Sequence, residues 1–286
     1  MTAEVYDSRI CTLGEGPLWH PERGQLFWFD ITANRLLGRA EDDALEWGFD
    51  QHVSAAGWVD HDRLLVASET ALSLFDIATG ARETLADLET DTPATRSNDG
   101  RADPHGGFWI GTMGKAAEPG AGAIYRYYRG EVRKLHGSIS IANAICFSPD
   151  GTTAYFADSP TRQVMRQRLG RDGWPEGEAE VFLDLRAQGL IPDGAVIDTD
   201  GTFWNAHWGA GKVCGYGPDG SLKACFDAPA PNLTCPAFGG PDLSILFLTS
   251  ATEAMGAADL ASHPDAGRTF RLDCGATGQA EHRVIL

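Results

Sequence analysis

The sequence has little positive charge. Its 286 residues include 23 Lys and Arg against 40 Asp and Glu, and its formal net charge at pH 7 is −17. A surface this acidic repels a phosphate backbone, so we expect no nucleic-acid partner. The excess attracts cations only weakly, and it does not by itself define a metal site.

Long apolar runs are also absent. No stretch approaches the roughly 18 consecutive apolar residues that a transmembrane helix needs, so no membrane partner is expected. Residues 1–7 lack the basic segment followed by an apolar segment that marks a secretory signal. The sequence therefore predicts a cytoplasmic location.

Neither the cysteines nor the serines form a reactive motif. The cysteines include no C-x-x-C pair, and they are Cys11, Cys146, Cys214, Cys225, Cys235 and Cys274. In a chain without a signal segment we expect them to be free, mostly buried thiols, and we expect no zinc-finger site. No serine lies in the G-x-S-x-G setting of a nucleophile elbow, which argues against a serine hydrolase of that type.

What the sequence does contain is a repeat. A unit of roughly 40–50 residues recurs, and in each unit a polar turn leads into a short β-rich, mostly aromatic run. Asp, Pro and Gly in these turns favour chain reversal, and the runs are too short and too aromatic for helices. The six turns lie at residues 19–24, 58–63, 102–107, 147–151, 197–201 and 238–242.

Six units of about four strands each predict an all-β fold, a six-bladed β-propeller with four-stranded blades. We expect residues 1–286 to form one such domain. The strand near residues 4–6 is expected to pair near residues 270–272, which completes the last blade and closes the ring. A pair of β-sandwiches is the structural alternative, but it does not explain so long a period.

Four polar stretches precede the first turns of their units, at residues 13–17, 96–100, 141–144 and 191–194. In a propeller the first strand of each blade lines the central channel, so we expect Glu15, Asn98, Asn143 and Asp193 to meet near the axis. Two carboxylates and a carboxamide at one point are costly unless a cation is bound. Oxygen donors suit Ca²⁺, Mg²⁺ or Mn²⁺, and Zn²⁺ is also acceptable.

The chain resembles the family of regucalcin (senescence marker protein), gluconolactonases and bacterial sugar-lactone hydrolases over essentially its whole length. The motifs that carry this resemblance lie at residues 13–19, 96–100, 108–113, 143–151 and 192–194. The resemblance implies metal-dependent hydrolysis of a sugar lactone to the sugar acid. It implies an aldonolactone substrate, such as a glucono-, xylono- or arabinonolactone, and one divalent metal ion as cofactor. We expect a monomer or a weak homo-oligomer.

The resemblance also implies roles for individual residues. Glu15, Asn143 and Asp193 are expected to ligate the metal. Arg96 and Asn98 are expected to contact the substrate, and Asp193 is expected to double as the general base that activates water. Taken one at a time, Glu15, Asn98, Asn143 and Asp193 each also fit an ordinary turn residue.

Several features stay open at this level. The family usually has Asn-Gly where this chain has Asn143 and Ala144, and the methyl group is tolerated unless the backbone needs a positive φ. The loop at residues 114–119 is expected to help to set substrate choice. His207 could line the channel mouth or pack at an edge, and Asp99 is expected to bind backbone or an ion pair behind the site.

Two other functions fit the same scaffold. One is a non-catalytic calcium-binding or regulatory propeller, and the other is a related esterase or organophosphate hydrolase. A platform for protein interactions would not need Glu15, Asn143 and Asp193 together on the axis. We therefore expect an enzyme, a carboxylic-ester hydrolase of the lactonase type.

Overall fold

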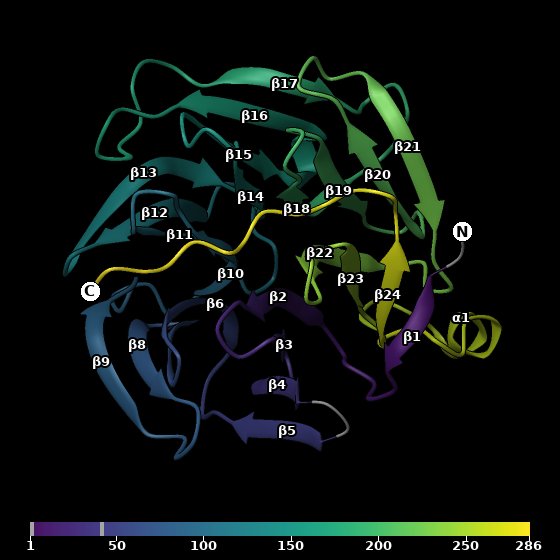
Figure 1. Ribbon diagram of the computed structural model, residues 1–286, viewed down its shortest axis with the longest axis horizontal. Coiled ribbons are helices and arrows are strands. Elements are labelled where there is room, and N and C mark those ends of the chain that lie inside the picture. Colours follow the sequence, from purple (N-terminus) through teal and green to yellow (C-terminus); the bar gives the residue numbers. More distant parts are fainter. Residues whose placement is uncertain (1–2, 41–42) are drawn as a thin grey trace.

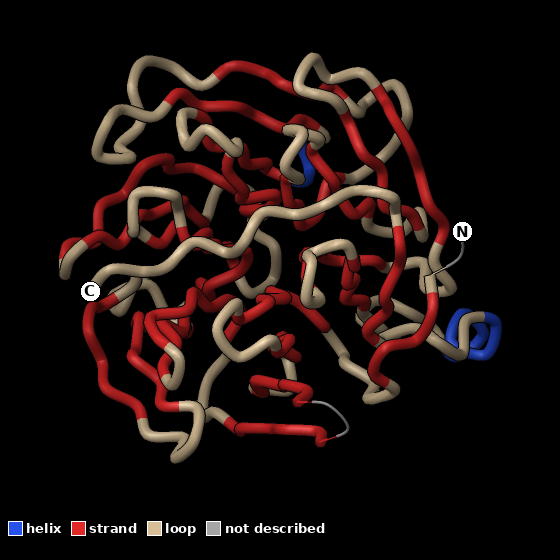
Figure 2. Tube along the Cα trace, in the orientation of Figure 1, coloured by secondary structure: helices blue, strands red, loops and turns tan. Residues whose placement is uncertain are grey.

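The structure is a computed structural model that describes residues 3–40 and 43–286. Within these residues, 24 strands form six antiparallel four-stranded sheets arranged as blades around a ring, so the predicted six-bladed β-propeller is confirmed (Figures 1 and 2). Helix α1 (Ala257–Ser262) lies at the outer edge of the ring beside β1. No helix in the described part of the chain is both long and apolar enough to cross a membrane.

The four strands of each blade are arranged from the ring axis outward. The strands at each position are given in the order of blades one to six. The strands nearest the axis are β2 (Gly14–His20), β6 (Val53–Asp60), β10 (Thr95–Ala102), β14 (Ala142–Phe147), β18 (Pro192–Ile197) and β22 (Leu233–Gly239). The second strands are β3 (Gln25–Asp30), β7 (Arg63–Ser68), β11 (Phe108–Gly114), β15 (Thr153–Asp158), β19 (Phe203–His207) and β23 (Ile245–Ser250).

The two outer positions complete each blade. The third strands are β4 (Arg35–Ala40), β8 (Ala71–Asp76), β12 (Gly122–Tyr128), β16 (Gln163–Arg168), β20 (Lys212–Tyr216) and β24 (Thr269–Asp273). The outermost strands are β5 (Asp43–Gly48), β9 (Arg82–Asp87), β13 (Glu131–Ile139), β17 (Glu180–Asp184), β21 (Leu222–Asp227) and β1 (Glu4–Asp7). A short 3₁₀ helix, Ser159–Thr161, joins β15 to β16.

The aromatic runs form strands because both of their faces are buried between neighbouring sheets. Phe27 and Phe29 of blade one pack in one cluster with Val66 and Phe75 of blade two. Fully burying each such side chain contributes about 1.5–3 kcal/mol. The outermost strands face solvent on one side, and β21 accordingly alternates exposed and half-buried residues.

The ring is closed by strands from opposite ends of the chain. β1 pairs antiparallel with β24, with Glu4 opposite Arg271 and Val5 opposite Phe270. This is the pairing that the sequence predicted. The last blade therefore takes three strands from the end of the chain and one from its start, and closure protects the inner sheet edges.

Residues 274–286 follow β24 and run across the ring in front of its central strands (Figure 1). Thr199 N–H donates to the Thr277 carbonyl at 2.9 Å, and Trp58 Nε1 donates to the Glu281 carbonyl at 2.8 Å. Ile285 N–H donates to the Gly106 carbonyl at 2.8 Å. This tail therefore ties blades five, two and three together where their inner strands end.

The tail also neutralises a buried guanidinium in the channel. Arg101 of β10 donates to the carbonyls of Ile145 and Ala195 at 3.3 Å and of Pro236 at 3.5 Å, which lie on β14, β18 and β22. Its charge is paired with the carboxylate of Glu281, and both side chains are buried. One cation thus links the inner strands of four blades to the tail.

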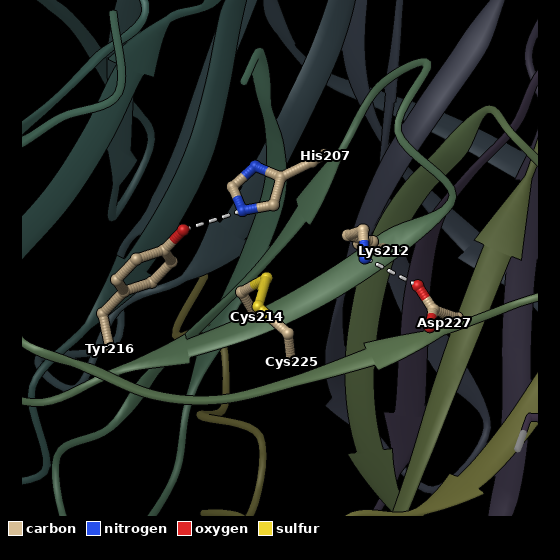
Figure 3. The surroundings of a disulfide bond; sticks show 6 residues. All are labelled: His207, Lys212, Cys214, Tyr216, Cys225 and Asp227. Carbon is tan, nitrogen blue, oxygen red and sulfur yellow. Dashed lines mark hydrogen bonds and ion pairs between the residues drawn. A yellow bond between two sulfur atoms is a disulfide. The ribbon is translucent and has the colours of Figure 1, made fainter. Parts of the chain in front are cut away.

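The expectation that all six cysteines are free is wrong for two of them. Cys214 on β20 and Cys225 on β21 form a disulfide (Figure 3). They lie directly opposite each other in the register of these strands, with their Cα atoms 4.1 Å apart. The register of these strands brings the two cysteines together. The sequence did not predict the pair, because the cysteines are 11 residues apart and form no C-x-x-C motif. The other four cysteines are free and buried, as expected.

We predict that Glu281→Ala lowers the free energy of unfolding by about 3–5 kcal/mol, because it leaves the Arg101 charge buried without its partner. Denaturant unfolding measures the change. Glu180→Ala is the matched control, because it breaks an exposed pair with Arg166 and should cost less than about 1 kcal/mol. The double variant Arg101→Met with Glu281→Leu should recover most of the loss. Equal costs for Glu281→Ala and Glu180→Ala would contradict the prediction.

Candidate functional site

Every inner strand is interrupted by a β-bulge. A bulge bends the strand and redirects side chains, and bulges are common beside functional sites. The register shifts in the first halves of these strands lie between Glu15 and Leu18, Val53 and Ala55, Ser97 and Gly100, Asn143 and Cys146, Pro192 and Ala195, and Leu233 and Pro236. Four of the six bulges carry or adjoin a residue that the sequence singled out.

A cavity of about 360 Å³ opens at these bulges. Its polar lining consists of Glu15, Arg96, Asn98, Asn143, Ser159, Asp193 and Glu253. Its apolar lining consists of Leu13, Met113, Ile141, Pro160, Ile191 and Trp208. The lining comes from the beginnings of inner strands and from loops that follow second strands, whereas the tail contacts the ends of inner strands. Ligand access and the tail are therefore at opposite ends of the channel.

The structure brings all five predicted site residues into this cavity. Glu15, Arg96, Asn98, Asn143 and Asp193 come from four blades, and each is only 4–7% exposed. Their convergence follows from the bulges and from the inner position of their strands. The chemical role of each residue stays a prediction.

Besides Pro160, three lining residues were not singled out for the site by the sequence. Ser159, Trp208 and Glu253 follow the second strands of blades four, five and six. The repeat could have predicted these residues, because every loop after a second strand lies on the face of the propeller where the inner strands begin. Such loops are the usual place for residues that contact ligands.

A chain of hydrogen bonds orients the amides of the site. Arg96 Nη1 donates to Asn98 Oδ1 at 2.8 Å, and Asn98 Nδ2 donates to Asn143 Oδ1 at 3.0 Å. Asn143 Nδ2 donates to Ser159 Oγ at 2.9 Å, and Ser159 Oγ donates to the Pro192 carbonyl at 2.7 Å. The chain runs from blade three to blade five. It leaves Asn143 Oδ1 with one further lone pair for a ligand.

Two of the three carboxylates that line the cavity, Glu15 and Asp193, have raised pKa values, which the charge of Arg96 only partly offsets. Burial raises the pKa of Glu15 to about 8, and the negative charge of Asp99 adds to this effect. Burial, followed by the charge of Glu15, raises the pKa of Asp193 well above its usual range. Glu15 Oε2 accepts a hydrogen bond from Gly16 N–H at 3.1 Å, and in the described part of the chain neither carboxylate forms a salt bridge.

Asp99 lies behind the site, as the sequence indicated. Its Oδ2 accepts the N–H of Ile145 at 2.7 Å, which ties β10 to β14 two residues beyond Asn143. Burial is the main cause that raises its pKa to about 6. Asp99 therefore supports the backbone that presents Asn143.

His207 does not line the cavity. It is buried on β19, and its Nε2 forms a 3.0 Å hydrogen bond with the Tyr216 hydroxyl (Figure 3). Burial lowers the pKa of His207 to about 4. Of the two roles left open by the sequence, packing inside blade five is the one observed.

The loop after β11 is held at its start. Lys115 Nζ pairs with Glu69 at 2.6 Å, which joins blade three to blade two beside the cavity. The role of this loop in substrate choice stays a prediction.

The backbone after Asn143 does need a positive φ. Ala144 has φ of 59°, and Gly16, which follows Glu15 at the equivalent place, has φ of 52°. Alanine at position 144, where the family usually has glycine, is therefore strained, since an L-residue at positive φ costs roughly 1–2 kcal/mol. The bulge maintains the conformation despite the methyl group.

The donor set fits a hard divalent cation. Within the described residues, Glu15 and Asp193 supply two buried carboxylates without salt bridges, and Asn143 supplies a carboxamide oxygen. Oxygen donors of this kind are preferred by Ca²⁺, Mg²⁺ and Mn²⁺. Within residues 3–40 and 43–286, no group of three or more His, Cys, Asp and Glu side chains could hold a metal, so a sulfur- or imidazole-rich centre is not indicated there.

A family model for the SMP-30/gluconolactonase/LRE-like region matches residues 13–252. The chain belongs to this family. The match covers the site residues from Glu15 to Asp193 and the loop residue Trp208. The resemblance stated from the sequence is therefore confirmed.

Relatives within the SMP-30/gluconolactonase family match over nearly their whole lengths. The solved structure of a calcium-binding protein, regucalcin, from Agrobacterium tumefaciens is 42% identical, with a TM-score of 0.97 over 100% of this chain and 99% of its own. A 6-deoxy-6-sulfogluconolactonase of Pseudomonas putida is 33% identical over 94% of each chain. A pentonolactonase of Haloferax volcanii is 33% identical over 99% of this chain and 98% of its own. These names confirm the expected enzyme class, a lactonase.

We predict that Gly16→Ala lowers the free energy of unfolding by about 2–4 kcal/mol, because it combines a positive φ with overpacking. A Cβ atom at Gly16 would lie 2.2 Å from the Ser54 carbonyl oxygen. Ala144→Gly is the matched exchange in blade four, and it should change stability by less than about 1 kcal/mol, since relief of strain and loss of methyl packing oppose each other. Chemical denaturation without metal measures both, and a Gly16→Ala cost below that of Ala144→Gly would contradict the prediction.

We predict that a divalent cation displaces about one proton when it binds at pH 7, because the pKa of Glu15, raised to about 8, keeps this group protonated in the metal-free protein. The apparent affinity should rise as the pH increases toward about 8. Calorimetry in two buffers of different ionisation enthalpy counts the protons. Glu15→Gln should release fewer, and a count of zero in the wild type would contradict the prediction.

Proposed function

We propose that this protein hydrolyses a sugar lactone to the sugar acid with one bound divalent cation. The substrate is an aldonolactone of the glucono-, xylono- or arabinonolactone type. The observation that carries the proposal is the pair of buried carboxylates of Glu15 and Asp193, which have raised pKa values, beside Asn143 in the same cavity as Arg96 and Asn98. The family and the lactonase names of its relatives support it.

Glu15, Asn143 and Asp193 would hold the cation. When bound, a divalent cation supplies a Lewis acid that polarises the lactone carbonyl. Calcium is the candidate favoured by the description of the Agrobacterium tumefaciens protein as calcium-binding, and Mg²⁺, Mn²⁺ and Zn²⁺ are the other candidates.

Asp193 acts as the general base. Its environment disfavours the ionised form, so its carboxylate, once ionised, has a high affinity for a proton. It takes a proton from the water that attacks the lactone carbonyl carbon. The ring C–O bond then breaks, the proton passes to the leaving ring oxygen, and the sugar acid forms.

Arg96 and Asn98 bind the substrate. Arg96 is held in place by the Asn98 side chain and by the Ser97 carbonyl, at 2.8 and 2.9 Å from Nη1. Its remaining N–H groups can donate to sugar hydroxyls or to the carbonyl oxygen. A fixed donor pair of this kind orients the lactone for attack.

A non-catalytic calcium-binding function is the second candidate, favoured by the same description of the Agrobacterium tumefaciens protein. Lactone turnover that disappears with a chelator and returns with metal would decide for the enzyme.

We further propose that residues 1–286 act as one domain, because the tail binds several blades. The cytoplasmic location and the monomeric or weakly associated state stay predictions.

We predict that Asp193→Asn lowers turnover by at least about 100-fold, because the general base is lost while the size of the side chain is kept. A pH-indicator assay on a panel of sugar lactones measures turnover after chelation and addition of Ca²⁺, Mg²⁺, Mn²⁺ or Zn²⁺, with spontaneous hydrolysis subtracted. Asp227→Asn is the control, because Asp227 is exposed and pairs with Lys212 (Figure 3).

Two outcomes would refute this assignment. Folded Asp193→Asn protein with turnover near that of the wild type would remove Asp193 from the mechanism. A wild-type protein that turns over no lactone with any of the four metals would refute the proposed function itself.

A further inference from the structure

Glu253 is a cavity residue that the proposed reaction does not use. It follows β23, and its side chain lines the same cavity as Arg96. Its backbone is held on both sides, because its N–H donates to the Thr12 carbonyl at 2.9 Å and its carbonyl accepts from Asn232 Nδ2 at 2.9 Å. Within the described residues its carboxylate forms no hydrogen bond or salt bridge. The backbone of Glu253 is therefore fixed, and its carboxylate is available to a ligand in the cavity.

The charges of Glu253 and Arg96 attract each other across the cavity. Burial lowers the pKa of Arg96. Among the charged groups that raise this pKa, Glu253 has the largest effect, ahead of Glu15. Glu69 also acts on Arg96, but its carboxylate is already paired with Lys115 and His52. Among the acidic residues that line the cavity, Glu253 is therefore the main counter-charge to Arg96.

The charges of the cavity then divide into two balanced sets. A divalent cation would compensate Glu15 and Asp193, and Glu253 compensates Arg96. Without Glu253, the cation and Arg96 together would leave an excess of one positive charge. That excess would attract any anion, including the carboxylate that forms when a lactone opens.

We propose that Glu253 sets the charge selectivity of the cavity, restricting its substrates to uncharged sugar lactones and weakening the binding of the anionic sugar acid. The proposal rests on the proposed function, and it names the substrate class of that site. It makes Glu253 a specificity residue that acts through the electrostatic potential, with no part in breaking the ester bond. The sulfonated lactone named for the Pseudomonas putida relative indicates that substrate charge can differ within the family.

The test compares wild-type protein with Glu253→Gln, both loaded with metal. Glu180→Gln is the matched control, because it removes the same charge from an exposed Glu–Arg pair on β17. Calorimetry measures the binding of xylonate, a sugar acid, and of xylitol, an uncharged polyol. Glu253→Gln should bind xylonate about tenfold more tightly and xylitol within about twofold of the wild type. Glu180→Gln should change neither affinity.

Kinetics provide a second readout. In Glu253→Gln, product inhibition by the sugar acid should strengthen about tenfold. The ratio of kcat/KM for glucaric acid monolactone, which carries a free carboxylate, to that for gluconolactone should rise by a similar factor. Glu253→Asp keeps the charge and should retain most of the wild-type selectivity.

The outcomes separate this inference from the proposed function. If the wild type hydrolyses lactones but Glu253→Gln leaves xylonate affinity unchanged, or changes xylonate and xylitol equally, the role of Glu253 is overturned. Absence of xylonate binding in both proteins also overturns it. If no lactone is hydrolysed, the proposed function fails, and the calorimetric comparison still decides whether Glu253 excludes anions.

Discussion

Two buried carboxylates, Glu15 and Asp193, impose the constraint on which the rest of the channel depends. Each has lost most of its water, and burial together with neighbouring negative charge makes its ionisation costly. A fold can hold such a pair only if other interactions supply its stability. Here the hydrophobic layers between blades do so, as where Phe29 and Phe75 pack together. The axis is thereby left for polar groups that bind a ligand.

Below the cavity the channel is filled by polar groups with fixed partners. Asp99 accepts the backbone N–H of Ile145, and Arg101 contacts the carbonyls of three inner strands. Glu281 of the tail then neutralises Arg101. This layered arrangement closes one end of the channel and supports the bulges at the other end. The cavity therefore opens on the face where the inner strands begin.

The candidate metal and substrate residues and three other lining residues lie on different parts of the blades. The candidate metal and substrate residues are on inner strands, where pairing with the second strand and a bulge hold them. Ser159, Trp208 and Glu253 lie in loops after second strands, where sequence can change without disturbing a sheet. Such a division allows one scaffold to serve lactones that differ in size or charge.

Sequence patterns alone predict the ring of six four-stranded blades, its closure near residues 4–6 and 270–272, and the group of polar residues that meets at the axis. These features follow from local patterns, since turn residues, short aromatic runs and a long repeat specify strands and their order. The same patterns do not predict the Cys214–Cys225 pairing, the burial of His207, or the places of Glu253 and Glu281. The physical reason is that strand register, loop path and the course of the tail depend on contacts between residues far apart in the chain, which no local pattern records.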